Sequence, residues 1–191
     1  MLPKSWYAGN LHLAAGVKNV PGAIVECGTW RGGMIAGIAD VLGPGRKYYL
    51  FDSFEGLPPA KEIDGEAALA WSKDVNGPYY YDNCRASEDE AKQTMSMSRA
   101  REFTTVKGWF EKTLPNAKVG PIALLRLDAD WYDSTKQVLD SFAHLVVPGG
   151  LILVDDYYVF QGCTKAVNEC AAARNWKIRQ YWRGEVCYVI T

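Results

Sequence analysis

Two short apolar runs of the 191-residue sequence end abruptly in aspartates, and this feature most restricts what the chain can form. The runs are IALLRLDAD at residues 122–130 and GGLILVDDY at residues 149–157. If they are neighbouring parallel strands, Asp128, Asp155 and Asp156 meet at one edge of a sheet. Two carboxylates about 4 Å apart repel by about 4 kcal/mol at an effective dielectric of about 20. A proton or a hard divalent cation (Mg²⁺, Mn²⁺ or Ca²⁺) would relieve this repulsion, so the sequence predicts a metal site on an α/β sheet.

The rest of the chain alternates between strand-like and helix-like segments, which predicts a mostly parallel sheet with helices on both faces. Strands are expected at residues 23–28, 47–53, 103–108, 122–128 and 150–156, and the main helices at about 33–42, 87–101, 134–146 and 162–174. Two further strands flank the tight-turn pair Arg183–Gly184, which predicts a terminal antiparallel hairpin and a seven-stranded sheet. We expect one domain over residues 1–191, with the irregular segment 54–84 as a lid or acceptor loop.

The first strand is followed by a glycine-rich turn that opens a helix, in the sequence ECGTWRGG at residues 26–33. Such a turn lets a ligand approach backbone N–H groups at Gly28, Thr29 and Trp30. Asp52, at the end of the second strand, suits a ribose diol. The bulk of Trp30 and the negative charge of Glu26 disfavour a pyrophosphate and favour a phosphate-free adenosine ligand with a cationic end, such as S-adenosylmethionine. The alternative is that the glycines serve only helix–strand packing.

The composition excludes several classes of protein. A net charge of −1 with both signs interspersed does not favour a nucleic-acid binder. The sequence contains no apolar run long enough for a bilayer and no signal-peptide core, so a membrane partner is not expected. Five scattered cysteines without a CxxC pair favour reduced thiols and a cytoplasmic location.

Four motifs occur in order and at fitting distances, and together they carry a resemblance to a known family. They are VECGTWRGG at 25–33, FDSFEGLP at 51–58, LRLDADWYDST at 125–135 and GGLILVDDY at 149–157. They resemble the macrocin-type O-methyltransferases, which methylate sugar hydroxyls of antibiotics, and the resemblance covers about residues 20–170. It implies the Rossmann-like class I methyltransferase fold, S-adenosylmethionine and Mg²⁺ as cofactors, and a possible homo-oligomer. The chain departs from the family before its first strand, where the antibiotic-tailoring members carry a longer region.

The resemblance also implies roles for particular residues. Glu26 and Gly28 would line the methionine end of the cofactor, and Asp52, with Ser53 beside it, would hold the ribose. The adenine would lie near Gly108, Trp109 and Phe110. Metal ligation is implied for Asp128, Asp155 and Asp156.

The predicted chemistry is metal-assisted transfer of a methyl group to a hydroxyl of a small molecule. The acceptor is a sugar, a catechol or another polyol, and the sequence leaves these open. Asp128 is expected to act as ligand and base, with Asp130 as the rival base if the strand extends that far. Two alternatives are an NAD-dependent oxidoreductase and a non-catalytic cofactor-binding relative that acts as a partner protein.

Overall fold

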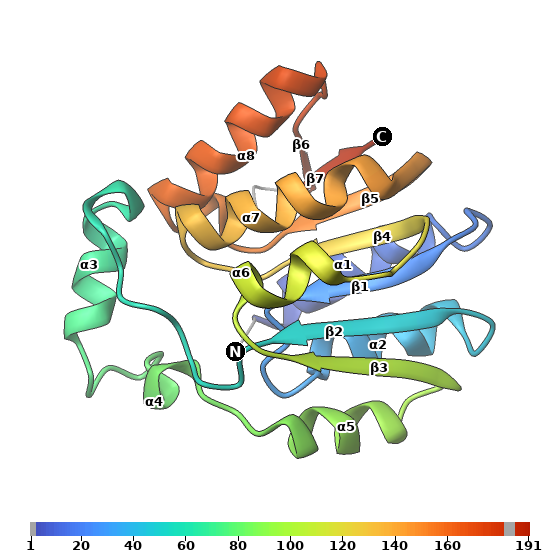
Figure 1. Ribbon diagram of the computed structural model, residues 1–191, viewed down its shortest axis with the longest axis horizontal. Helices are drawn as coiled ribbons and strands as arrows, with labels where there is room; N and C mark the ends of the chain where they lie inside the picture. Colours follow the sequence, from blue (N-terminus) through green and yellow to red (C-terminus); the bar gives the residue numbers. More distant parts are fainter. Residues whose placement is uncertain (1–2, 182–185) are drawn as a thin grey trace.

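Helices cover both faces of a seven-stranded sheet in the computed structural model, which describes residues 3–181 and 186–191 (Figure 1). The strands are β1 (Ala23–Cys27), β2 (Lys47–Asp52), β3 (Glu102–Lys107), β4 (Ile122–Leu127), β5 (Val146–Val154), β6 (Arg179–Tyr181) and β7 (Val186–Ile190). Their order in the sheet is β3-β2-β1-β4-β5-β7-β6. Strands β1 to β5 pair in parallel, whereas β7 runs antiparallel to both β5 and β6. This arrangement confirms the predicted class I methyltransferase fold; the predicted turn Arg183–Gly184 lies outside the described residues.

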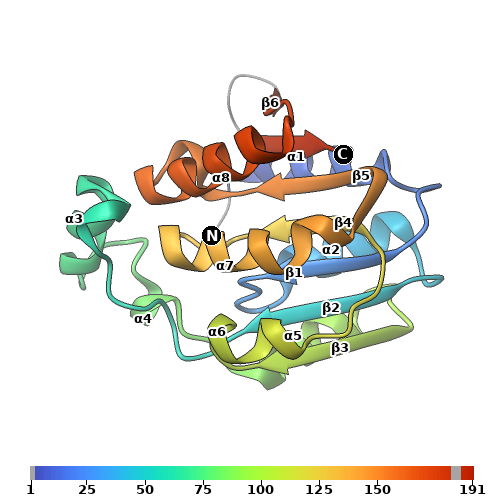
Figure 2. The same ribbon diagram turned by 45° about the horizontal axis from the view of Figure 1, so that its top comes forward.

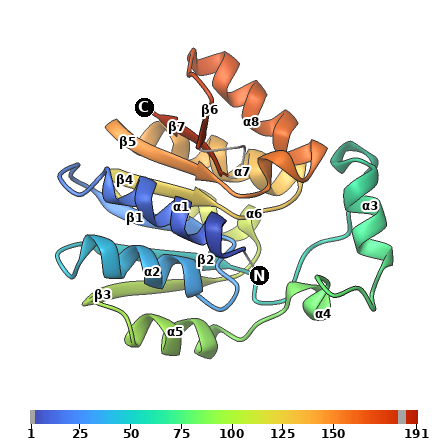
Figure 3. The same ribbon diagram turned by 180° about the vertical axis from the view of Figure 1, so that it is seen from behind.

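The helices are α1 (Lys4–Ala15), α2 (Gly33–Leu42), α3 (Glu66–Lys73), α4 (Tyr81–Cys84), α5 (Glu88–Ser96), α6 (Phe110–Thr113), α7 (Tyr132–Phe142) and α8 (Gln161–Arg174). They form one layer on each side of the sheet, except for α3 and α4, which lie beyond the strand ends (Figures 1 and 3). Helices α6, α7 and α8 lie on the face seen in Figure 1, and α1, α2 and α5 lie on the face seen in Figure 3. Short 3-10 turns are η1 (Glu62–Asp64), η2 (Leu114–Asn116), η3 (Ala143–Leu145) and η4 (Asp156–Tyr158). Among the residues that the structure describes, no helix is both long and apolar enough for a membrane span.

Alternating side chains divide the core into two layers, because successive strand residues point to opposite faces. Ile24 of β1 and Leu124 of β4 pack in the cluster beneath α1, α2 and α5. Val25 and Leu125 pack in the cluster beneath α7 and α8. By the same alternation, Glu26, which follows Val25, faces the α1 side. This places a charged residue in a fully buried strand.

The start of β5 differs from the prediction. The sequence predicts this strand from residue 150, yet β5 already begins at Val146 and includes Pro148 and Gly149. Val146 pairs with Ile122, and the register shifts before Leu151, where regular pairing with Leu124 resumes. Gly149 and Gly150 therefore form an irregular section inside the strand, with φ 78° at Gly149.

Candidate functional site

A cavity of about 1850 Å³ lies at the carboxyl ends of the central strands. Its floor comes from the ends of β1, β2, β4 and β5, and the beginning of α1 contributes Trp6 and Tyr7. The segment 54–85 forms a further wall, and α3 of this segment stands beyond the strand ends in Figures 1 and 2. Open α/β sheets bind ligands outside the carboxyl ends of their strands, so the location agrees with the predicted site.

The first turn is held in place by Asp52. One of its carboxylate oxygens accepts hydrogen bonds from the backbone N–H groups of Thr29 and Trp30, both at 2.7 Å, and the other accepts from Phe54, also at 2.7 Å. The Trp30 indole points to the lid side, where it donates to the carbonyl of Arg85 at 3.0 Å. Asp52 therefore fixes the conformation of the turn beside which a ribose would bind. Trp30 links that turn to Arg85, directly after the lid.

Gly28 is required by the packing of two strand ends. Its φ is +84°, and a Cβ at this position would lie 1.6 Å from the carbonyl oxygen of Asp128. The chain of β1 thus passes directly against the chain leaving β4. A glycine that the sequence associated with a ligand serves first to let these two segments meet.

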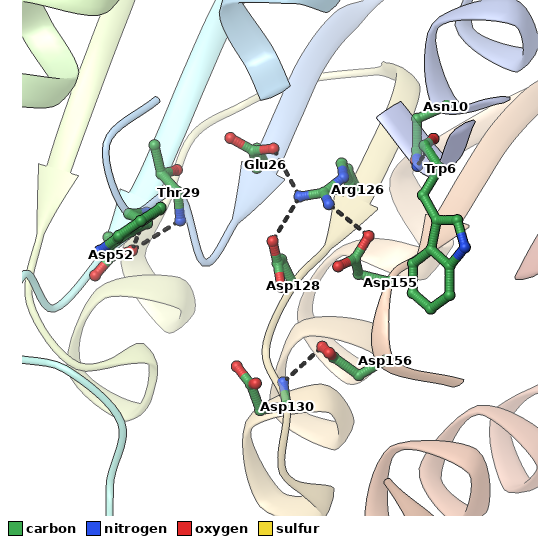
Figure 4. A network of polar contacts seen from close by, with 11 residues as sticks. Trp6, Asn10, Glu26, Thr29, Asp52, Arg126, Asp128, Asp130, Asp155 and Asp156 are labelled. Carbon is green, nitrogen blue, oxygen red and sulfur yellow. Dashed lines mark hydrogen bonds and ion pairs between the residues drawn. The ribbon is translucent and has the colours of Figure 1, made fainter. Parts of the chain in front are cut away.

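A buried arginine joins three carboxylates at the cavity floor (Figure 4). Arg126 Nη1 lies 2.9 Å from Glu26 Oε1 and 2.9 Å from Asp128 Oδ2, and Nη2 lies 2.7 Å from Asp155 Oδ1. The Arg126 and Glu26 side chains are only 1% and 2% exposed, whereas Asp128 is 34% exposed and faces the cavity. Glu26 Oε2 and Arg126 Nε are buried and have no hydrogen-bond partner in the structure.

The acidic group differs from the predicted metal set. The sequence grouped Asp155 with Asp128 and Asp156, but the structure gathers Asp128, Asp130 and Asp156, with one oxygen of each within 4.8 Å of the others. Asp155 is paired with Arg126 instead. The chain turns into η4 at the end of β5, and Asp155 and Asp156 point in different directions (Figure 4). Asp130 adopts a left-handed φ of 57°, and its backbone N–H donates to Asp156 Oδ2 at 3.1 Å.

The negative charges of these carboxylates are only partly balanced by positive charges nearby. Burial, and then the charge of Asp128, raises the pKa of Asp130 well above its ordinary value. Burial and the charge of Asp130 do the same to the pKa of Asp156. Burial also raises the pKa of Glu26, although the ion pair with Arg126 opposes this effect. Additional cations in the cavity would favour the ionised forms of all three groups.

The other predicted cofactor residues lie around the same space, with one exception. Ser53, Trp109 and Phe110 line the cavity together with the residues of the first turn. Gly108 is not among the lining residues, and its N–H donates to the carbonyl of Asp52 at 2.9 Å. Gly108 therefore supports the end of β2 rather than the cavity wall.

The segment predicted as a lid closes on itself. The N–H of Leu57 donates to the Asn83 carbonyl at 3.1 Å, and the Asn83 side chain donates to the Leu57 carbonyl at 2.8 Å. Between these ends the chain is less irregular than predicted, since it includes η1 and α3. Asp64 anchors η1 because its carboxylate accepts from the N–H of Tyr132 at 2.7 Å and of Lys61 at 2.8 Å.

The sequence analysis missed Arg126, although a signal was present. A charged residue inside the apolar run IALLRLD needs a partner once the strand is buried. Glu26, in the neighbouring strand, is in register with Arg126. The analysis also missed Trp6 and Tyr7 of α1, for which the local sequence carried no comparable signal.

Comparisons with known proteins agree with this geometry. A sequence model of the macrocin O-methyltransferase (TylF) family matches residues 11–180. The chain belongs to the macrocin O-methyltransferase family. A demethyldecarbamoylnovobiocin O-methyltransferase of Streptomyces niveus is 32% identical over 161 residues, which are 81% of this chain and 60% of that protein. The 4′-O-methyltransferase of Streptomyces olivaceus that acts on 8-demethyl-8-(2,3-dimethoxy-alpha-L-rhamnosyl)-tetracenomycin C is 32% identical over 158 residues, or 78% of this chain and 58% of that protein.

The fold of this family member also matches solved structures. The O-methyltransferase NovP superposes with a TM-score of 0.78 at 28% identity, covering 95% of this chain and 79% of that one. The calicheamicin methyltransferase CalS11 has a TM-score of 0.68 at 23% identity, over 97% of this chain and 77% of that one, and shows the shared fold. The chain spans about three fifths of the length of the two Streptomyces relatives.

Proposed function

We propose that this protein transfers a methyl group from S-adenosylmethionine to a hydroxyl of a small acceptor, assisted by Mg²⁺ or another hard divalent cation. The observation that carries the proposal is the geometry of the cavity floor. A buried glutamate with a free oxygen stands there beside three converging carboxylates, in a chain of the macrocin O-methyltransferase family. The family match does not favour the NAD-dependent alternative, and the retained carboxylates do not favour a non-catalytic role.

The chain offers polar atoms that fit the cofactor. Glu26 Oε2 and Thr29 Oγ1 are buried, lack partners in the structure and belong to residues that line the cavity. Glu26 would accept from the amino group of the cofactor's methionine end. Asp52 would hold the ribose, and Trp109 and Phe110 would contact the adenine.

The acidic group fits a hard cation, since it offers three carboxylate oxygens within 4.8 Å of one another. Mg²⁺ binds oxygen ligands at about 2.0–2.1 Å, so a small inward shift of Asp128, Asp130 and Asp156 would suffice. When bound, the ion would lower the pKa of the acceptor hydroxyl and orient it. Asp130 is the better candidate for the proton acceptor, because Asp128 is paired with Arg126.

The acceptor would lie between the carboxylates and the lid. Trp71, Tyr79 and Tyr81 of the lid line the cavity, as do Trp131 and Phe160, and the Trp71 ring packs on Trp131 with centroids 5.8 Å apart. Aromatic walls of this kind suit the apolar faces of a sugar ring or of an attached ring system. The substrate in the name of the Streptomyces olivaceus relative carries a rhamnosyl group, so a sugar hydroxyl is the preferred acceptor class.

Replacing Asp52 by alanine tests the cofactor assignment. Isothermal titration calorimetry with S-adenosylhomocysteine should show at least a tenfold loss of affinity, or about 1.4 kcal/mol. The variant should stay folded, with an unfolding free energy lower by about 1–3 kcal/mol because three backbone N–H groups lose their acceptor. Asp40→Ala is the matched control, since Asp40 accepts only outside the cavity, from the N–H of Arg99. Unchanged affinity in Asp52→Ala would argue against the assignment.

Hydrogen exchange tests the lid. Residues 66–83 should exchange at least tenfold faster than α8 in the free protein, because few of their contacts reach the sheet layers, and should slow when S-adenosylhomocysteine binds. Residues near Asp64 should be better protected, since that side chain is bonded to the start of α7. Equal exchange of residues 66–83 with and without the ligand would contradict a lid.

A further inference from the structure

Arg126 lies between the proposed cofactor site and the acidic group. Its single guanidinium group contacts residues of both. Arg126 lies in β4 in register with Glu26 of β1, so the two side chains are neighbours on the α1 face of the sheet. Asp128, two residues further along, lies on the same face, and Asp155 is at the tip of β5. Figure 4 shows the guanidinium group among these three carboxylates. A guanidinium has five N–H donors in a fixed plane, and here only its Nη atoms are engaged.

The carboxylates that Arg126 binds are assigned to two different ligands, the cofactor and the cation. On one side, Nη1 holds Glu26 Oε1, which leaves the buried oxygen Oε2 free toward the proposed cofactor position. On the other side, the same Nη1 atom binds Asp128, whose carboxylate also belongs to the acidic group with Asp130 and Asp156. Nη2 binds Asp155, which is not a member of that group. A cation that enters the acidic group must therefore share Asp128 with the guanidinium.

We propose that Arg126 is a positioning residue with opposite effects on the two ligands. It holds the Glu26 carboxylate in place for the amino group of the cofactor, and it restrains divalent-ion binding by competing for Asp128. This inference rests on the proposed function, because it assigns Glu26 to the cofactor and Asp128 to the ion. The competition follows from charge: the guanidinium repels a divalent cation and occupies one of its ligands.

Arg126→Met should separate the two effects in binding measurements. Calorimetry should show S-adenosylhomocysteine binding at least tenfold more weakly, because Glu26 loses the group that orients it. Titration with Mg²⁺ alone should show binding at least fivefold tighter, because Asp128 is released and a nearby positive charge is removed. If the substitution only disrupted the local structure, both S-adenosylhomocysteine and Mg²⁺ would bind more weakly. Arg126→Lys keeps the positive charge but loses the planar guanidinium group. Its Mg²⁺ affinity should therefore remain near that of the wild type, whereas S-adenosylhomocysteine should bind more weakly.

Arg46→Met provides a matched control. Arg46 donates four hydrogen bonds, where Arg126 donates three, but all four go to backbone carbonyls of residues 17–22, and Arg46 does not line the cavity. Its replacement should lower stability without changing either affinity by more than about twofold.

If Arg126→Met does not fold, Glu26→Gln decides the question. The guanidinium would then be shared by two carboxylates instead of three and would compete more strongly for Asp128. Mg²⁺ should bind at least threefold more weakly, although Glu26 is not a member of the acidic group. An unchanged Mg²⁺ affinity in this variant would overturn the inference.

The measurements distinguish failure of the inference from failure of the proposed function. A wild-type protein that binds neither S-adenosylhomocysteine nor Mg²⁺ would refute the proposed function, and the inference with it. A wild-type protein that binds both, combined with an Arg126→Met variant in which both affinities fall or neither changes, would refute the inference alone.

Discussion

Asp128→Asn should lower the rate of methyl transfer about 1000-fold and remove the stabilisation that Mg²⁺ gives to the fold. The expected loss is large because Asp128 joins the acidic group and the Arg126 network, so its charge acts on the cation and on the reacting hydroxyl. In the wild type, Mg²⁺ at 100 times its dissociation constant should raise the unfolding free energy by about 2.7 kcal/mol. Thermal unfolding with and without Mg²⁺ measures this gain, and a radiolabelled methyl-transfer assay measures the rate.

Two further variants show which carboxylates take part. Asp140→Asn is the control, since Asp140 is an exposed residue of α7 that pairs with Lys136 and does not line the cavity. It should change neither the rate nor the gain from Mg²⁺. Asp130→Asn should lose the gain, because the structure places Asp130 in the acidic group. If Asp155→Asn lost it and Asp130→Asn kept it, the ion would use the set predicted from the sequence, and the revised set would be wrong.

Gly28→Ala should destabilise the protein by more than about 4 kcal/mol or prevent folding. The added methyl group would lie 1.6 Å from the Asp128 carbonyl oxygen, and the φ of +84° is unfavourable for alanine by about 1–2 kcal/mol even without that contact. Chemical denaturation monitored by circular dichroism gives the unfolding free energy. Because β1 and β4 would have to separate, the cavity floor should be lost together with the stability.

Gly33→Ala is the matched control for this prediction. Gly33 belongs to the same turn and begins α2, but a Cβ there would meet no atom within 4 Å. Alanine at that helix position should be neutral or stabilising by up to about 1 kcal/mol. A Gly28→Ala protein as stable as Gly33→Ala would mean that the strand ends of β1 and β4 do not meet as described.

Much of the fold could be predicted because the signals are local. Buried strands and their connecting helices repeat along the chain, and α8 begins within one residue of its expected start and ends at the expected residue. Predictions failed at the ends of elements, where pairing with a neighbouring strand decides how far a strand extends. Pro148, Gly149 and Gly150 have the composition of a turn, but the pairing of Val146 with Ile122 extends β5 across them. That pairing depends on a neighbouring strand and leaves no mark in the local sequence.

The sequence by itself determined the succession of the strands along the chain and the arrival of Asp128 and Asp155 at strand tips, since both follow from apolar runs that stop at known residues. The tertiary structure alone decided which carboxylates converge. A one-residue step on a strand reverses the direction of a side chain, and a bend beyond the strand end redirects it again, so Asp155 turns to Arg126 while Asp130 and Asp156 turn to each other. The pairing of Glu26 with Arg126 likewise needed the register of β1 against β4, which is fixed by packing between segments 100 residues apart.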